Sequence, residues 1–271
     1  MRKMKISLLV SMASLTMAAL SAHSAPVMPF FGDAPTGWVT DRYDPNSFQN
    51  VGPYQGRNDV LGIGISQADG LNNRPSGFQS TFYNTQGKKQ AISGGAGSVL
   101  SAALYIPGAW ANPSNGHVRT DMWGAMSGGP SLDYTIFGFT NYGGAARLRD
   151  WDDETPLGWV DILTAIVYDA WTDFAVEFTG STYEYRLNGD LVYTDATING
   201  STGFSETIMQ AYNFCGDSSL QGAVCSNYTA QWSNSVGAEV PTPGSLSLAA
   251  LAMLALGGTS IRGRRTLTAT A

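Results

Sequence analysis

Residues 171–194 read WTDFAVEFTGSTYEYRLNGDLVYT, and this stretch decides the fold class. Apolar and polar side chains alternate through its first run, which places Phe174 and Phe178 on one face of a strand. A Gly-containing turn follows, and a second alternating run ends at Asn188-Gly189. Asn-Gly is typical of a two-residue hairpin turn, because both central positions of that turn need positive φ angles. The stretch therefore predicts a β-meander of three antiparallel strands.

The rest of the chain carries short β-like runs separated by turns rich in Gly, Pro and Asn. Their spacing of about 8 to 12 residues is typical of a sandwich or barrel. No repeat of fixed period is visible, which argues against a propeller or solenoid. The runs that qualify as strands are residues 59–66, 77–83, 98–106, 117–122, 133–140 and 145–151. We predict one all-β domain over residues 26–238, built as a two-sheet antiparallel β-sandwich.

The meander also carries a family resemblance. Its Trp, alternating strand, Gly-containing turn, aromatic strand and Asn-Gly pair resemble the core hairpins of concanavalin A-like and laminin G-like domains. The resemblance covers residues 165–194 and implies a lectin-like jelly roll, in which the meander is central. Another kind of β-sandwich is the alternative.

The N-terminus has the layout of a secretory signal peptide. Arg2, Lys3 and Lys5 form a positive start, an apolar run follows, and small residues lead up to Ala25. The apolar run is too short to span a bilayer comfortably. We expect signal peptidase to cleave after Ala25, so that residues 1–25 are removed.

The C-terminal segment, residues 239–271, carries a second targeting signal. It begins with a proline-containing stretch that disfavours helix. An uncharged run over residues 245–261 and a basic tail over 262–271 follow. The defining residues are Pro241, Pro243, Gly244, Arg262, Arg264 and Arg265. As a helix the uncharged run reaches roughly 25 Å, slightly short of the hydrocarbon core, so snorkelling arginines and local thinning would complete a span. The arginines predict a cytoplasmic C-terminus.

This order of Pro-x-Pro-Gly, apolar run and arginine cluster resembles the PEP-CTERM sorting signal of Gram-negative bacteria. The sequence departs from the family pattern at Thr242, where Glu is usual, and in residues 266–271, which extend beyond the arginines. The resemblance implies an exosortase as processing partner and a transient anchor in the inner membrane. It also implies delivery to the cell surface or an extracellular polysaccharide matrix. An ordinary C-terminal membrane anchor is the alternative.

Charge limits the partners of the exported part. Removing residues 1–25 and the apolar run with its basic tail, residues 245–271, leaves nine basic residues against all 21 acidic residues, a formal charge of −12. Such a surface repels nucleic acid and anionic lipid headgroups, so we expect neither as a partner of the domain. Cys215 and Cys225 are the only cysteines. In an oxidising compartment they are expected to form a disulfide, whereas a metal site lacks further Cys or His nearby.

Local catalytic patterns are missing from the sequence. No Glu-x-Asp-x-(x)-Glu arrangement is present, and no Gly-x-Ser-x-Gly elbow stands between a strand and a helix. His117 is the only histidine of the exported part, and a lone histidine is more often structural. We therefore predict no catalytic residues. A hydrolase whose carboxylates come from distant strands is the alternative, since such enzymes need two carboxyl groups on one site.

The densest polar cluster lies between Arg149 and Glu154. Its carboxylates are the oxygen ligands that calcium prefers, which makes them a candidate calcium site, and no other cofactor is predicted. The candidate ligands are Asp150, Asp152, Asp153 and Glu154. Trp151 and Trp123 are candidate glycan-binding residues, because an indole face can stack on a sugar ring. The alternative is an acidic solvent loop with the tryptophans packed in the core.

These observations predict an exported, non-catalytic protein of the cell surface or extracellular matrix that binds polysaccharide. The step from fold to ligand is an analogy, since sandwiches host many functions. Two alternatives are a structural or adhesion protein of the matrix with no small ligand, and a carbohydrate-active hydrolase with carboxylates from distant strands.

Overall fold

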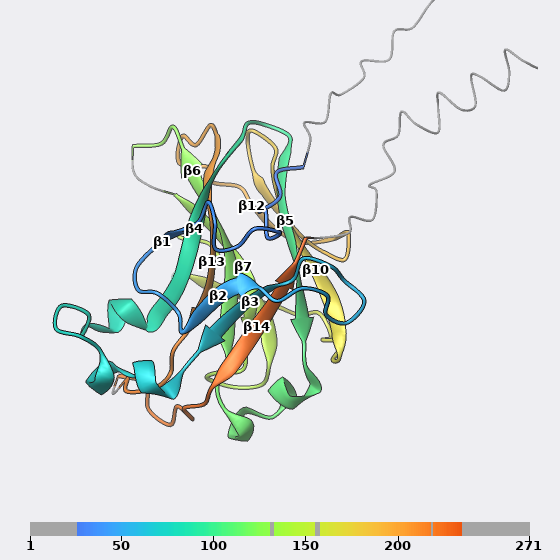
Figure 1. The fold of residues 1–271 in the computed structure, drawn as a ribbon. Helices are drawn as coiled ribbons and strands as arrows, with labels where there is room; N and C mark the ends of the chain where they lie inside the picture. Colours follow the sequence, from blue (N-terminus) through green and yellow to red (C-terminus); the bar gives the residue numbers. More distant parts are fainter. Residues whose placement is uncertain (1–25, 131–132, 155–157, 218, 235–271) are drawn as a thin grey trace, which may run out of the picture. The chain divides into compact units, whose positions relative to one another are not determined.

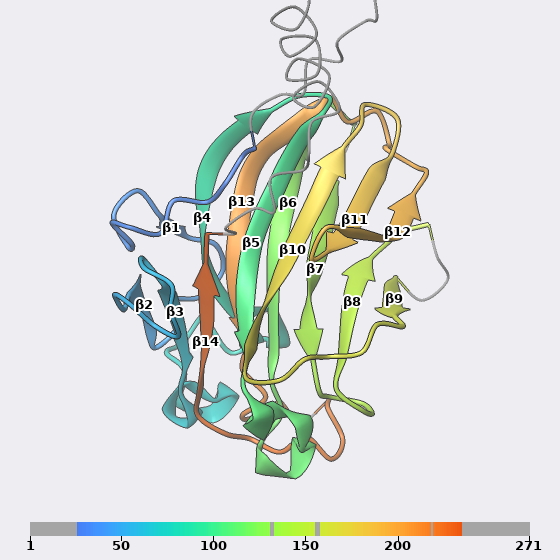
Figure 2. The ribbon, with the colours of Figure 1, turned by 90° about the vertical axis from the view of Figure 1, so that its right-hand side faces the viewer.

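The computed structural model describes residues 26–130, 133–154, 158–217 and 219–234. They form an all-β sandwich of two antiparallel sheets (Figures 1 and 2), which confirms the predicted fold class. The predicted signal peptide and the sorting segment, with its helix at residues 245–261, lie outside the described residues. Within the described part of the chain, no helix has the length and apolar character needed to cross a membrane.

Each sheet has seven strands. The first, called the β6 sheet, contains in spatial order β1 (Val39–Thr40), β4 (Thr85–Gly94), β13 (Gly203–Tyr212), β6 (Arg119–Ser127), β7 (Tyr134–Thr140), β8 (Arg147–Trp151) and β9 (Trp159–Ile162). The second, called the β10 sheet, contains β12 (Asp190–Asp195), β11 (Tyr183–Leu187), β10 (Ala170–Phe178), β5 (Ser98–Ile106), β14 (Tyr228–Ser233), β3 (Leu61–Ile65) and β2 (Ser47–Asn50).

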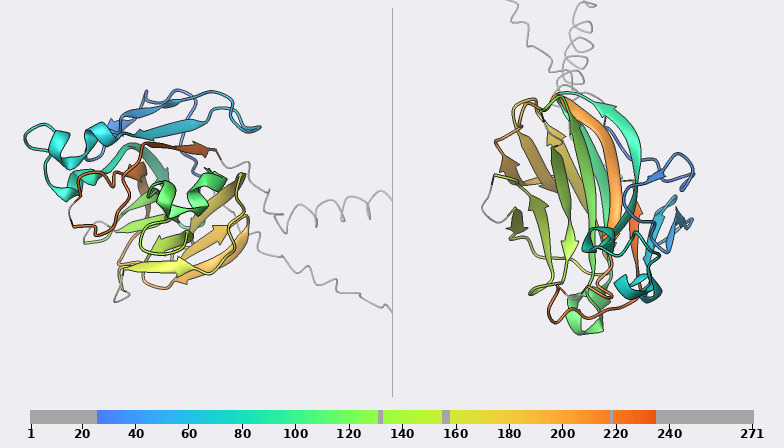
Figure 3. Two further views of the ribbon diagram at one scale, coloured as in Figure 1. Left: turned by 90° about the horizontal axis from the view of Figure 1, so that it is seen from below. Right: turned by 90° about the vertical axis from the view of Figure 1, so that its left-hand side faces the viewer.

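Short 3-10 helices complete the described structure. They are η1 (Gln67–Asp69), η2 (Leu71–Asn73), η3 (Thr81–Asn84), η4 (Gly108–Ala111) and η5 (Pro113–Asn115). In Figure 3 the blue and cyan segments near β2 and β3 lie on the side of the sandwich opposite the yellow and orange β10 to β12.

The predicted meander is present as β10, β11 and β12. In β10 the residues Thr172, Phe174, Val176 and Phe178 are buried and their neighbours are half-buried, as the alternation predicts. The Asn-Gly turn between β11 and β12 has positive φ angles of 51° and 90° at its two residues. The meander forms one edge of the β10 sheet, with β12 as the edge strand.

Aromatic residues from both sheets meet in the core between them. The Phe137 ring of β7 lies 4.8 Å from the Phe174 ring of β10 and 5.3 Å from the Tyr185 ring of β11, measured between ring centres. A buried hydrogen bond also crosses the core, from Trp232 Nε1 to Thr120 Oγ1 at 2.9 Å. Because these side chains alternate along their strands, the residues between them face outward.

One predicted strand is wrong. Residues 77–83 do not join a sheet: the Phe78 amide donates to the Pro75 carbonyl in a turn, and the 3-10 helix η3 follows. The aromatic rings of this run pack on each other locally, with Phe78 and Tyr83 5.0 Å apart. Local ring packing and a turn thus replace the expected strand pairing.

Six of the observed strands lie outside the predicted runs: β1, β2, β4, β9, β13 and β14. β13 lies in the β6 sheet between β4 and β6 and is buried along much of its length on both faces, so it lacks the alternation of a half-exposed strand. The disulfide expected between Cys215 and Cys225 is present, with the two Cα atoms 4.7 Å apart.

Candidate functional site

One face of the β6 sheet is turned away from the core, and we call it the outer face. Met122 of β6 is a core residue, so alternation places its neighbours Asp121 and Trp123 on the outer face. The strand registers align a row of residues directly opposite one another across this face. The row consists of Gly87, Gln210, Asp121, Gly138, Arg149 and Asp161, from β4, β13, β6, β7, β8 and β9.

Asp121 is the centre of a polar network in this row. Its Oδ2 accepts a hydrogen bond from Arg119 Nε at 2.7 Å and one from Gln210 Nε2 at 3.4 Å. Gln210 Oε1 in turn accepts from Arg42 Nη1 at 3.2 Å. The other oxygen, Oδ1, is buried and has no hydrogen-bond partner among the described residues. Asp121 itself is only 1% exposed, so half of a buried carboxylate is left unsatisfied.

The carboxylate of Asp121 leans over a glycine of the neighbouring strand. A Cβ atom at Gly138 would lie 2.5 Å from Asp121 Oδ1, closer than a side-chain carbon can approach. Glycine is therefore required opposite Asp121, and its missing side chain leaves room for the carboxylate.

Arg149 lies in the same row and is also buried. Its guanidinium carbon is 3.7 Å from the centre of the Trp159 ring, and that of Arg119 is 4.7 Å from the same ring. Arg149 Nε has no hydrogen-bond partner, and no ion pair among the described residues includes Arg149. Burial, followed by the positive charge of Arg119, lowers the pKa of Arg149 to about 9.

An aromatic row runs beside the polar row. The register places Trp123, Ile136, Trp151 and Trp159 directly opposite one another on the outer face. The two candidate glycan-binding residues therefore share one face: Trp123 is buried under Arg42, whose guanidinium lies 4.9 Å from the indole, and Trp151 is half-buried. Trp123 Nε1 is buried and has no hydrogen-bond partner in the described structure. Trp159, 5.1 Å from Trp151, completes the row and was missed by the sequence analysis.

Together the two rows offer the chemistry of a polyhydroxyl ligand site. Indole rings supply apolar faces for sugar rings. Asp121, Arg149 and Trp123 supply one acceptor and two donors that have no partner within the described residues. A carboxylate in such a place can also exchange a proton with a bound substrate. Local sequence patterns could not reveal this site, since its residues come from several strands that are far apart along the chain.

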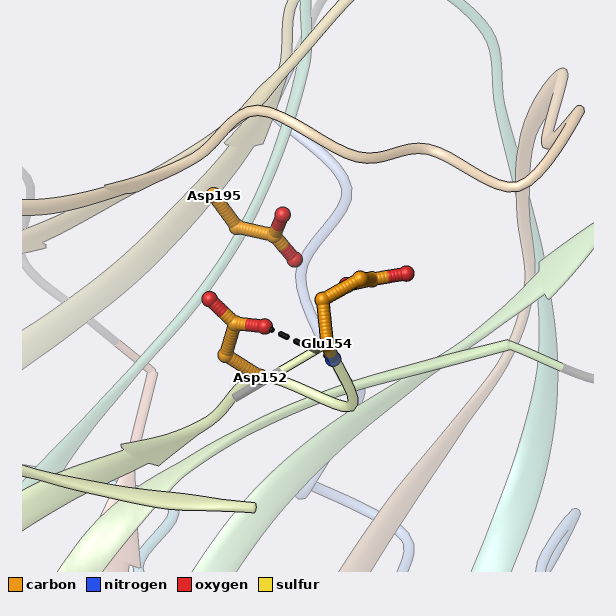
Figure 4. A group of neighbouring side chains, drawn as sticks. All are labelled: Asp152, Glu154 and Asp195. Carbon is orange, nitrogen blue, oxygen red and sulfur yellow. Dashed lines mark hydrogen bonds between the residues drawn. The ribbon is translucent and has the colours of Figure 1, made fainter. Parts of the chain in front are cut away.

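A second group of acidic residues lies where the two sheets meet. Carboxylate oxygens of Asp152, Glu154 and Asp195 lie within 4.8 Å of one another (Figure 4). Two of the four predicted calcium ligands belong to this group, and Asp195 was not among those predicted. Asp150 and Asp153 are not part of the group of three, although Asp150 lies two residues before Asp152 on the same strand face. The sorting-signal residues fall outside the described residues.

No protein-family model and no curated protein matches the chain. Solved structures with a similar fold include a β-glucanase of Bacillus licheniformis, at 12% identity over 75% of this chain and 93% of that one, with a TM-score of 0.46. A structure described under endo-acting O-glycanases of the human gut microbiota matches at 12% identity over 74% and 91%, with a TM-score of 0.48. An alginate lyase of polysaccharide lyase family 7 matches at 11% identity over 71% and 82%, with a TM-score of 0.38.

At these identities the likeness concerns the fold. These three structures carry the names of glycan-cleaving enzymes, and this finding contradicts our prediction of a non-catalytic binding module. The prediction rested on the lack of a local pattern of paired acids. Its physical weakness is that a sheet can assemble a site from single residues on several strands, as the row around Asp121 illustrates.

Proposed function

We propose that the protein is a carbohydrate-active enzyme that cleaves a polysaccharide bound along the outer face of the β6 sheet. The observation that carries the proposal is the buried carboxylate of Asp121. One of its oxygens is held by Arg119 and Gln210, and the other has no hydrogen-bond partner among the described residues. In this proposal Asp121 transfers the proton at the scissile linkage, and the Trp rings of the neighbouring row support the sugar rings.

Hydrolysis of a glycosidic bond uses two carboxyl groups, one for proton transfer and one that attacks the sugar or activates water. Two further carboxylates lie on the same network or row. Asp41 forms an ion pair with Arg42 at 2.7 Å, and Arg42 contacts Gln210. Asp161 ends the polar row and pairs with Arg147 at 2.8 Å. Asp161 lies three strands from Asp121, about 14 Å at the usual strand spacing, which exceeds the separation of a catalytic carboxyl pair. Asp41 is therefore the candidate for the second carboxylate.

Basic residues are concentrated on this face. Four of them form ion pairs with neighbouring acids, whereas Arg149 forms none in the described structure and therefore favours an acidic group on the substrate. Five of the nine lie there by strand register or contact, in a domain whose net charge is strongly negative. They are Arg42, Lys89, Arg119, Arg147 and Arg149. A guanidinium pairs well with a carboxylate, in particular at a site shielded from water.

The unpaired charge of Arg149 favours a second candidate reaction, cleavage of a uronate-containing polysaccharide by elimination. Arg149 would neutralise the uronate carboxylate, and Asp121 would take the proton from the carbon beside that carboxylate. The electron pair of the broken C–H bond forms the carbon-carbon double bond, and the linkage oxygen leaves with its bonding pair and takes a proton from water. The products then carry a carbon-carbon double bond conjugated to the carboxylate. Ultraviolet absorbance of that group separates elimination from hydrolysis, in which the products stay saturated.

The test is depolymerisation of a panel of neutral and acidic polysaccharides by the purified domain, followed by the release of reducing ends. We expect cleavage of at least one acidic polysaccharide, and we expect Asp121→Asn to lower the rate by about a hundredfold or more, because it removes the proton-transfer group while keeping the side-chain shape. Asp190→Asn, an exposed acid on the other sheet, is the matched control and should leave the rate unchanged. An Asp121→Asn variant as active as the wild type excludes this role for Asp121.

The proposal includes delivery outside the cell. The signal-peptide layout of residues 1–25 and the likeness of residues 239–271 to a PEP-CTERM sorting signal support export followed by processing by an exosortase. An enzyme acting at the cell surface or in the surrounding matrix would meet extracellular polysaccharide there. The two-sheet sandwich with its terminal meander is compatible with the finer proposal of a lectin-like jelly roll.

A further inference from the structure

The connection between β13 and β14 carries the Cys215–Cys225 disulfide and packs against the connection that leads into β6. In Figure 2 these orange and green segments lie together at the lower end of the sandwich. Two hydrogen bonds join them through one pair of residues. The backbone amide of His117 donates to the Val224 carbonyl at 2.8 Å, and the Val224 amide donates to His117 Nδ1 at 2.6 Å. His117 thus holds the chain directly before Cys225.

The imidazole of His117 is enclosed by aromatic rings. The Tyr142 ring meets it edge-on, with the ring centres 5.1 Å apart, and the Phe214 ring lies 5.6 Å away. Phe214 precedes Cys215 and Val224 precedes Cys225, so the imidazole contacts both of the segments that the disulfide joins. His117 is only 8% exposed, and its ring therefore has little contact with water.

The hydrogen bond to Nδ1 fixes the protonation state of the imidazole. Nδ1 accepts the proton of the Val224 amide, so it carries no proton itself, and the neutral ring has its hydrogen on Nε2. Protonation would turn Nδ1 into a donor that faces another donor, and it would place a charge in an enclosed site. Burial accordingly lowers the pKa of His117 below its ordinary value.

The ionisable groups on the elements packed against the imidazole have other partners. They are Arg119 at the start of β6, Tyr142 and Arg147 around the turn between β7 and β8, and Tyr212 and Asp217 near the disulfide. Asp217, the carboxylate of this set, accepts from the Tyr212 hydroxyl at 2.7 Å and from the Asn84 side chain at 2.8 Å. Among the described residues, none of these groups forms a hydrogen bond or ion pair with the imidazole that would stabilise its charged form.

Residues 219–225 have few other contacts with the body of the sandwich. The Tyr142 hydroxyl donates to the Gln221 carbonyl at a long 3.5 Å, and the Gln67 side chain donates to the Cys225 carbonyl at 3.2 Å. Val224 is 38% exposed, so its side chain contributes little burial. A segment with so little buried surface opens locally at a low free-energy cost, and the loss of two hydrogen bonds is then a large part of what holds it.

We propose that His117 is an acid-sensitive latch, which holds residues 219–225 in place while it is neutral and releases them when it is protonated. The disulfide keeps the released segment tethered at Cys225. The direction follows from linkage: the latched state binds a proton less readily than the open state, in which a histidine titrates near about 6.5. The latch is therefore closed above that pH and opens as the pH falls below it. This inference does not depend on the proposed enzymatic activity.

The first test follows the imidazole by NMR in the purified protein. The chain has two histidines, His23 and His117, so the ring signals of His117 are identified by their loss in His117→Asn. At neutral pH we expect the hydrogen on Nε2, a titration midpoint below about 6.5, and a Val224 amide signal that shifts with the same midpoint. A ring with its hydrogen on Nδ1, or a midpoint at or above that of a free histidine, overturns the proposal.

The second test measures the release itself by hydrogen exchange, corrected for the intrinsic effect of pH on exchange. The protection of the Val224 amide should fall as the pH decreases from about 6.5, by up to about tenfold per pH unit until His117 is fully protonated. Amides in the centre of β13 should keep their protection over the same range, which separates local release from unfolding of the sandwich. Equal protection of Val224 at about pH 7.5 and about pH 5 contradicts the latch.

Variants separate the acceptor at Nδ1 from the packing of the ring. His117→Asn places an acceptor oxygen near the position of Nδ1 but does not titrate, so its Val224 protection should not depend on pH. His117→Phe keeps a ring and removes the acceptor, so the segment should be open at every pH. Tyr142→Phe is the matched control, because it keeps the ring contact with His117 and should retain the pH dependence of the wild type. A His117→Asn variant that loses protection in acid as the wild type does would assign the pH dependence to another group.

Discussion

Arg149 occupies a place on the outer face where an apolar residue would cost less free energy. It is buried against Trp159, its Nε lacks a partner among the described residues, and burial lowers its pKa to about 9. A charge that is desolvated without an ion pair destabilises a fold, unless a ligand compensates it. The proposed acidic substrate would supply that compensation. The buried charge of Arg149 would then lower the stability of the fold and strengthen the binding of substrate.

We therefore predict opposite effects of Arg149→Met on stability and on substrate binding. Methionine fills a similar volume beside Trp159 without a buried charge, so the free energy of unfolding should stay equal or rise by about 1–2 kcal/mol, measured by urea denaturation. The KM for the cleaved polysaccharide should rise by about tenfold, because a charge-assisted hydrogen bond is lost. Arg186→Met, which removes a half-exposed arginine paired with Glu184 on the other sheet, should not alter the KM. A destabilised Arg149→Met variant with unchanged KM would mean that Arg149 has a structural role only.

At the scale of elements, the meander is a structure that residues close together in the sequence encode. The turn between β11 and β12 uses Asn188 and Gly189 at positive φ, and the Asn188 side chain accepts a hydrogen bond from the Asp173 amide at 2.9 Å. Each of these features is encoded within a few residues. By contrast, β13 pairs with β4 and β6, which lie far away along the chain, and its pattern alone does not identify it as a strand.

Gly189→Ala should cost about 1–2 kcal/mol in the free energy of unfolding. The φ of 90° at this residue is unfavourable for any residue with a Cβ, while a Cβ there would touch nothing within 4 Å, so the cost arises from the backbone alone. Gly95→Ala is the control, because its φ is not positive and an added Cβ would make one loose contact at 3.9 Å. Equal stability of the two variants in chemical denaturation would refute the argument from backbone conformation.

At the scale of the whole molecule, charge distinguishes residues 26–238 from the two terminal segments. Six of the 15 basic residues belong to the two terminal segments, and five of the remaining nine gather on the outer face of the β6 sheet. Four of these five form ion pairs with acidic residues, so this face is close to neutral while the rest of residues 26–238 is strongly acidic. An acidic polysaccharide would be repelled least at this face, which would orient it on approach.

Processing of the chain can be tested on the exported protein itself. We expect intact-mass spectrometry of material recovered from outside the cell to show a chain that begins at Pro26 and lacks the tail with Arg262, Arg264 and Arg265. Replacing Pro241 and Pro243 by alanine should leave the tail attached and hold the protein in the membrane fraction, while Asp190→Asn should be processed normally. An exported wild-type chain that retains the three arginines contradicts sorting by exosortase.

The sequence by itself determined the features whose physical cause is local. The meander follows from alternation and a two-residue turn, and the disulfide joins cysteines that are close along the chain. The two terminal targeting signals stay predictions from composition. Only the tertiary structure decided the candidate site and the acidic group around Asp152. Asp121 and Gln210 are 89 positions apart, and Asp195 meets Asp152 from the other sheet. Such pairs depend on which strands become neighbours, and that choice is made by the packing of the whole sandwich.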